Sequence, residues 1–143
     1  MENHGHGVKE EMIPDNELAG AAMKAMNHSY APYSKFKVGA AVITKSGRIF
    51  TGTNVENASY GLTVCAERVA IFKAVSEGDA EIERIAVVSS SGEMTFPCGA
   101  CRQVINEFNR HAIVVTANSF GETERNKMET LLPNAFGPDD LTV

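Results

Sequence analysis

The sequence lacks a surplus of basic side chains and lacks any long apolar segment. Its 143 residues contain 13 Lys and Arg against 18 Asp and Glu, a formal net charge of -5. Because this charge would repel a phosphate backbone, we expect no nucleic-acid partner. No run of about 18 apolar residues is present to cross a membrane, and residues 1–10 are polar, without the apolar centre of a secretion signal. We therefore expect a cytoplasmic protein that does not act at a membrane.

Cysteine is also scarce. The chain has three cysteines, an odd number that a secreted disulfide framework rarely leaves. Cys98 and Cys101 form a C-x-x-C pattern and lie too close together in the sequence to close a long loop. Metal or redox chemistry in a reducing compartment accounts for these thiols better than disulfides do.

The length and the apolar content predict one domain. A chain of 143 residues with 43% hydrophobic side chains can bury a core without covalent staples. Residues 1–13, which include His4-Gly5-His6-Gly7, are predicted to form a flexible tail, and residues 14–143 a single domain. The two tail histidines could bind metal, although a mobile tail is a poor platform for ligands.

Hydrophobic periodicity and turn signals predict alternating helices and strands. Thr63 is expected to cap a helix that begins at Val64 or Cys65, runs to Glu77 and is closed by Gly78. The expected helices cover residues 14–28, 64–77 and 97–108, and the expected strands cover residues 36–44, 48–54, 82–89 and 112–117. This order predicts an α/β sandwich with helices over a sheet, in which two helices begin at cysteines.

Those two helix starts suggest a metal site. Cys98 and Cys101 at one start and Cys65 at the other would bring three thiolates to one cation and leave the fourth tetrahedral position open to water, the pattern of a catalytic zinc. Zinc lowers the pKa of such a water to about 7, and Glu67, two residues beyond Cys65, could act as its general acid and base.

The same residues allow other interpretations. The C-x-x-C pair could be a redox pair, Cys65 a small buried hydrophobe and Glu67 a helix-start charge. A structural zinc with His28 or His111 as fourth ligand is a further alternative.

The motif Cys65-Ala66-Glu67 followed by Pro97-Cys98-Gly99-Ala100-Cys101 resembles the signature of the zinc nucleobase deaminases. The similarity extends from about residue 15 to residue 141. Residues 30–36, 54–60, 65–68, 97–103, 131–133 and 136–138 resemble the small cytidine deaminases whose zinc ligands are all cysteines.

The resemblance implies a three-layer α-β-α fold with a mixed, five-stranded sheet, and a homotetramer whose subunits share active sites. The fifth strand would have to lie between Thr116 and Thr130, around the polar residues 121–127. It also implies one zinc per subunit and hydrolytic deamination of cytidine or deoxycytidine in pyrimidine salvage, by zinc-bound hydroxide and a glutamate proton shuttle. It leaves open which of the two nucleosides is preferred.

The resemblance assigns a role to each site residue. Cys65, Cys98 and Cys101 would hold zinc, and Glu67 would move the protons. Asn54 and Glu56 would hydrogen-bond the sugar 3'-hydroxyl, Phe36 and Phe136 would pack on the pyrimidine, the Ala66 backbone would hold the base, and Tyr60 would lie at a subunit interface near the pocket. Arg68 and Gln103 would hydrogen-bond the sulfurs, because zinc with three thiolates keeps about one negative charge that weakens the metal as a Lewis acid.

Taken by residue type alone, these side chains have simpler explanations. Asn54 and Glu56 could be polar residues of a turn without a binding role, Phe36 could belong to the core, and Arg68 could be an exposed charged residue on a helix. Competing functions are deamination of a modified aminopyrimidine nucleoside, as in the blasticidin type, a zinc-stabilised interaction module and a thiol redox protein.

Overall fold

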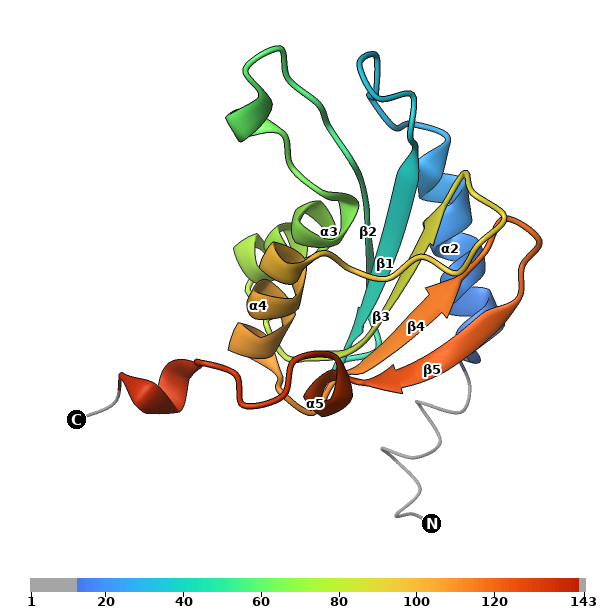
Figure 1. The fold of residues 1–143 in the computed structure, drawn as a ribbon. Coiled ribbons are helices and arrows are strands. Elements are labelled where there is room, and N and C mark those ends of the chain that lie inside the picture. The colour runs from blue at the N-terminus through green and yellow to red at the C-terminus, as the bar shows by residue number, and fades with distance from the viewer. Residues whose placement is uncertain (1–12, 142–143) are drawn as a thin grey trace.

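The computed structural model describes residues 13–141, which form a five-stranded sheet with helices on both faces (Figure 1). The strand order is β2-β1-β3-β4-β5; only β3 and β4 are parallel, and the other neighbours are antiparallel. The elements are α2 (Asp15–Met26), β1 (Val38–Thr44), β2 (Ile49–Thr53), the 3-10 helix η2 (Tyr60–Leu62), α3 (Ala66–Ser76), β3 (Ile82–Ser89), α4 (Gly99–Phe108), β4 (Ile113–Ala117), β5 (Thr123–Lys127), α5 (Met128–Leu131) and the 3-10 helix η3 (Pro138–Asp140).

The sheet separates two apolar cores. Alternate side chains of β1 point to opposite faces, so that Ala40 and Val42 pack with α3 and α4 whereas Ala41 and Ile43 pack with α2. Figure 1 shows the same division, with α2 on one side of the sheet and α3 and α4 on the other. The predicted three-layer α/β sandwich with a mixed, five-stranded sheet is therefore confirmed.

The fifth strand lies where the resemblance required it. Thr123–Lys127 pairs antiparallel with β4 along its whole length, from Ala117 opposite Thr123 to Ile113 opposite Lys127. It is an edge strand whose residues are exposed or only partly buried, so the alternation of apolar residues that reveals a strand in a sequence is missing. Backbone pairing therefore defines this strand.

Several boundaries differ from the prediction by a few residues. The first helix spans Asp15–Met26 rather than residues 14–28. Thr63 does not cap α3: it ends the 3-10 helix η2, and its hydroxyl accepts a hydrogen bond from the Asn57 backbone at 3.2 Å. The N-cap positions of α3 and α4 are instead occupied by Cys65 and Cys98, so the expectation that both helices begin at cysteines is confirmed.

The predicted tail, with His4 and His6, lies outside the described residues apart from Ile13. Ile13 packs against the core on the α2 side, and its carbonyl accepts a hydrogen bond from Arg84. The division into a tail at residues 1–13 and a domain at residues 14–143 stays a prediction. None of the helices between residues 13 and 141 has the length and hydropathy of a membrane span.

Two glycines let helices approach the sheet closely. A Cβ at Gly52 in β2 would lie 2.5 Å from Ala66 O and from Ala70 N of α3. On the other face, a Cβ at Gly39 in β1 would collide with Ala22 O of α2. Gly52 thus sets how closely the first turn of α3, which follows Cys65, lies on the sheet.

Candidate active site

The N-terminal ends of α3 and α4 bring the three cysteines together. The three Sγ atoms lie within 4.8 Å of one another, and the Sγ atoms of Cys65 and Cys98 are 3.9 Å apart. Cys101 is buried, Cys65 half-buried and Cys98 exposed. Thiols from separate stretches of chain therefore converge at one point that remains open to solvent on one side.

This sulfur cluster fits one zinc ion. With Zn–S bonds of about 2.3 Å, tetrahedral ligands stand roughly 3.8 Å apart, close to the Cys65–Cys98 separation. Among residues 13–141 no histidine or carboxylate joins the group. His28 is exposed, and His111 Nδ1 lies 2.9 Å from Glu129 Oε2 of α5. Three protein ligands leave one coordination position for water or substrate, the arrangement of a catalytic rather than a structural zinc.

Hydrogen bonds prepare one sulfur as a thiolate. The hydrogen bond between Cys101 and Cys65 lowers the pKa of Cys65 to about 5, and hydrogen bonds from Arg68 and Cys98 contribute to this shift. The same bond, together with burial, raises the pKa of Cys101. Because zinc binds thiolates, zinc binding to this cluster releases the thiol protons.

Arg68 and Gln103 lie in different environments. Arg68 Nη2 is 3.4 Å from Cys65 Sγ, as the resemblance implies, and this contact with Cys65 raises the pKa of Arg68. Gln103 Nε2 instead donates to the carbonyl oxygen of Phe136 at 2.8 Å. In this structure Gln103 therefore holds the C-terminal segment, and Arg68 contacts the sulfur cluster.

Glu67 is a buried carboxyl beside the sulfurs. It lies in the first turn of α3 and is 4% exposed. Burial raises the pKa of Glu67 to about 7, with the Cys65 thiolate also raising it. A carboxyl with a pKa near neutrality can both accept and return a proton. A helix-start charge placed only for its favourable dipole would stay in water, so burial argues against that simpler interpretation.

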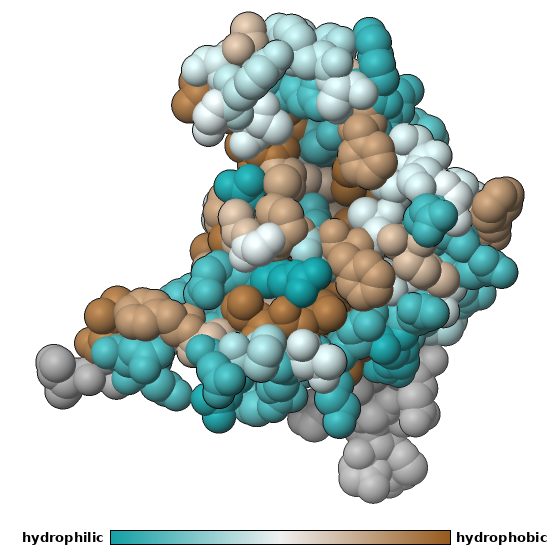
Figure 2. Space-filling view, viewed as in Figure 1, coloured by the Kyte–Doolittle hydropathy of each residue, from teal (hydrophilic) through white to brown (hydrophobic). Residues whose placement is uncertain are grey.

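A cavity of about 210 Å³ connects Cys65 and Cys98 to four of the predicted substrate residues. Figure 2 shows that this face of the molecule is hollowed beneath the projecting loop that carries η2. The lining comes from the segment before β1, the end of β2, the start of α3 and the loop before α4: Ser34, Phe36, Val38, Asn54, Glu56, Thr63, Cys65, Ala66, Glu67, Thr95, Phe96 and Cys98.

Asn54 is buried at the cavity and has one free donor. Its Nδ2 donates to Phe36 O at 2.8 Å, and its Oδ1 accepts from Val38 N at 2.9 Å and from the Ser29 hydroxyl. A carboxamide offers two donor hydrogens and two acceptor lone pairs. Both lone pairs and one hydrogen are therefore used, and one N–H is left for a ligand.

Glu56 complements this donor with an acceptor. Its Oε1 accepts the backbone N–H groups of Tyr33 at 2.9 Å and Ser34 at 3.1 Å, and its Oε2 accepts the Ser34 hydroxyl. These bonds, the Ser34 side chain first, lower the pKa of Glu56. The carboxylate keeps a lone pair on Oε2. Asn54 can therefore donate a hydrogen bond to a ligand hydroxyl while Glu56 accepts one from the same hydroxyl.

Four of the six predicted substrate residues line the cavity, and two do not. Phe36, Asn54, Glu56 and Ala66 lie on its wall. Tyr60, in η2, is 74% exposed and its ring meets Tyr33 edge to face at 6.2 Å, whereas Phe136 is 59% exposed beside α4.

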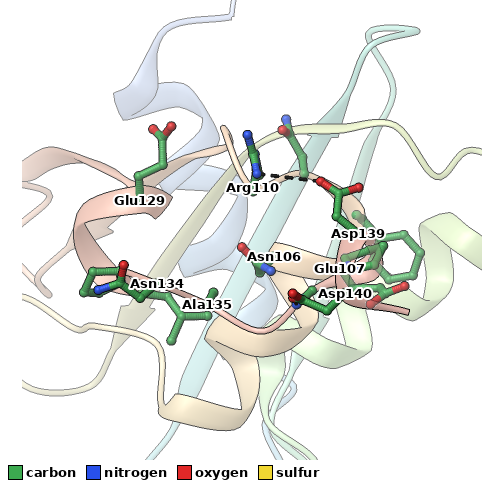
Figure 3. A pocket seen from close by; sticks show the side chains of 14 residues that line it. Asn106, Glu107, Arg110, Glu129, Asn134, Ala135, Asp139 and Asp140 are labelled. Carbon is green, nitrogen blue, oxygen red and sulfur yellow. Dashed lines mark hydrogen bonds and ion pairs between the residues drawn. The ribbon is translucent and has the colours of Figure 1, made fainter. Parts of the chain in front are cut away.

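Sequence reasoning missed Ser34, Thr95 and Phe96 as cavity residues. Thr95 and Phe96 stand directly before Pro97-Cys98, and that position was the available signal. A second hollow, of about 380 Å³, lies around Arg110, Glu129 and Asp139 (Figure 3) and contains none of the predicted site residues.

Comparison with known proteins places this geometry in a family. The family model described as the cytidine and deoxycytidylate deaminase zinc-binding region matches residues 12–117. The chain belongs to the cytidine and deoxycytidylate deaminase family. A cytidine deaminase from Sporosarcina psychrophila is 46% identical over 127 residues, covering 88% of this chain and 93% of the relative. The cytidine deaminase of Mycobacterium tuberculosis (strain ATCC 25618 / H37Rv) is 41% identical over 132 residues, covering 90% and 96%.

Solved structures of cytidine deaminases share the fold. The crystal structure of the enzyme from Burkholderia pseudomallei matches with a TM-score of 0.80 at 48% identity, over 83% of this chain and 96% of that one. The Mycobacterium tuberculosis enzyme matches with a TM-score of 0.77 at 40% identity, over 86% and 97%. The predicted deaminase family and its zinc cofactor are thus confirmed, the latter by the zinc-binding region of the family model and by the cysteine cluster.

Proposed function

We propose that this protein hydrolyses the 4-amino group of cytidine or deoxycytidine, giving uridine or deoxyuridine and ammonia. The observation that carries this proposal is a cavity lined by the buried Glu67 and by Cys65 and Cys98 of the three converged cysteines, with Asn54 and Glu56 in another part of the same lining. We assign the enzyme to pyrimidine salvage in the cytoplasm, where thiols stay reduced.

Glu67 moves the protons in this mechanism. Bound zinc supplies a Lewis acid that lowers the pKa of water and makes it a nucleophile at neutral pH. Glu67 accepts a proton from the attacking water and delivers it to N3 of the ring, so that C4 becomes electrophilic. The proton of the new C4 hydroxyl then passes through Glu67 to the exocyclic nitrogen, the C–N bond breaks, and ammonia leaves as C4 becomes a carbonyl. The raised pKa of Glu67 suits both transfers.

Asn54 and Glu56 select a nucleoside over a free base. The free Asn54 N–H and the free Glu56 lone pair fit a sugar hydroxyl, and we assign them to the 3'-hydroxyl. Cytosine lacks the sugar hydroxyl and would leave both groups without this ligand partner. Phe36 packs on the pyrimidine face, and the Ala66 backbone holds the base from the start of α3.

A neighbouring subunit completes the site. Phe136 and Tyr60 are exposed aromatic residues that do not line the cavity of their own chain. We assign both to subunit interfaces of a homotetramer, with Phe136 reaching the pyrimidine bound by an adjacent subunit. Size-exclusion chromatography with light scattering checks the tetramer, and a monomer of full activity would contradict it.

The test of the activity is a substrate panel with zinc-loaded protein. Ammonia release and the loss of the ultraviolet band of the base are followed on cytidine, deoxycytidine, cytosine and a modified aminopyrimidine nucleoside. We expect turnover of the two nucleosides and at least tenfold lower kcat/KM on cytosine. Turnover of the modified nucleoside alone, or of none of the four, would overturn the proposal.

A further inference from the structure

Arg102 connects the loop before Cys98 to the C-terminal part of the chain. It lies on α4, one residue after Cys101, and its side chain is partly buried. Its Nε donates to the carbonyl oxygen of Pro97 at 2.8 Å, and its Nη1 donates to the carbonyl oxygen of Leu131 at 2.8 Å. One guanidinium thus joins the residue before a zinc ligand to the last residue of α5.

The hydrogen bond from Arg102 matters for the conformation of the chain at Pro97. Pro97 is buried, and its oxygen lies just before the N-cap of α4, where the chain turns into the helix. A buried carbonyl without a partner is costly, and rotation of the Pro97–Cys98 peptide to find another donor would also turn Cys98. The Cys98 side chain is exposed, so packing does little to fix its sulfur.

The second hydrogen bond ties the same loop to the segment that carries Phe136. Leu131 ends α5, and the next side chain of α4, Gln103, donates to Phe136 O at 2.8 Å. Arg102 and Gln103 therefore hold two carbonyls of residues 131–136 against α4. The planar fork of arginine can serve two separate acceptors at once, which a lysine ammonium at the end of a flexible stem does less well.

We propose that Arg102 is a positioning residue of the zinc site: it fixes the peptide before Cys98 and couples that ligand to the C-terminal segment. The role rests on the proposed zinc chemistry, but it makes a separate claim, that a side chain without contact to metal or substrate sets how firmly the metal is held. Loss of groups that orient metal ligands commonly costs 10- to 100-fold in metal affinity.

The experiment measures zinc release from the intact protein into excess chromophoric chelator. The test variant is Arg102→Gln, and the matched control is Arg84→Gln, because Arg84 also donates to a backbone carbonyl, that of Ile13, but is buried on the α2 face of the sheet. Thermal unfolding of both metal-free variants records the general loss of stability. The visible spectrum of cobalt-substituted protein reports the thiolate geometry independently of turnover.

We expect zinc release to be about tenfold faster in Arg102→Gln, with a changed cobalt spectrum, and unchanged in Arg84→Gln at equal or larger loss of thermal stability. Should Arg102→Gln fail to fold, Arg102→Lys takes its place, with an intermediate rate expected because lysine can serve one carbonyl. Release at the wild-type rate in the variant measured, or equal acceleration in the Arg84 control, would overturn the inference. Failure of the wild type to hold zinc at all would instead refute the proposed function.

Discussion

Replacing Gly52 with alanine should push α3 away from the sheet and thereby disturb the zinc site. The new Cβ would lie 2.5 Å from Ala66 O and Ala70 N, about 0.9 Å short of the 3.4 Å at which ordinary contact begins. Both atoms belong to the backbone of α3, so the helix must move. Zinc–ligand distances tolerate only about 0.2 Å, and Cys65 is the N-cap of this helix. A shift of even half the shortfall would therefore exceed what the metal site accepts.

The expected cost in stability is about 1 to 3 kcal/mol from overpacking, reduced by the smaller backbone entropy of alanine in the unfolded chain. Urea denaturation of metal-free protein measures this loss, and competition with a chelator measures zinc affinity, which should fall at least tenfold. Gly39→Ala is the matched control, because its Cβ would meet Ala22 O of α2, on the face without zinc ligands. Zinc affinity within twofold of wild type in Gly52→Ala, or equal loss of zinc in Gly39→Ala, would show that Gly52 does not set the position of Cys65.

Three further substitutions test the site. Glu67→Gln should retain zinc and lower kcat by roughly 100- to 10,000-fold, because it removes the proton acceptor; activity within tenfold of wild type would remove Glu67 from the mechanism. Glu56→Gln should lower kcat/KM for cytidine about tenfold or more but change it little for 3'-deoxycytidine, which lacks the hydroxyl that this residue would bind; equal losses on both substrates would exclude the assignment. Arg68→Gln should keep one zinc per chain but lower turnover roughly 10- to 100-fold, because the Cys65 sulfur loses its charged donor; zinc loss with full specific activity per bound zinc would contradict this role.

Buried strands could be located from the sequence, because burial on both faces selects runs of β-branched residues. The predicted strand at residues 82–89 matches β3, Ile82–Ser89, at both ends. The edge strand β5, Thr123–Lys127, carries polar residues, and only the family resemblance pointed to it. The Thr63 cap was wrong, because a residue of that type suits several roles in an irregular loop.

The metal ligands were predictable because zinc chemistry restricts residue type and spacing. Cys65, Cys98 and Cys101 stood out in a chain with no other cysteine. The partner of Gln103 was not predictable, since an amide bonds any acceptor within reach and the C-terminal segment presents the Phe136 carbonyl. Thr95 and Phe96 line the cavity because of the path of the loop between β3 and α4, and their position directly before Pro97-Cys98 was the one signal for them in the sequence.

Zinc K-edge X-ray absorption of the purified protein would identify the atoms that hold the metal. We expect one zinc per chain with three sulfur ligands at about 2.3 Å and one oxygen or nitrogen ligand at about 2.0 Å, the latter altered when a cytidine analogue is added. Fewer than three sulfurs, or a fourth ligand with the scattering pattern of histidine that no nucleoside displaces, would contradict it.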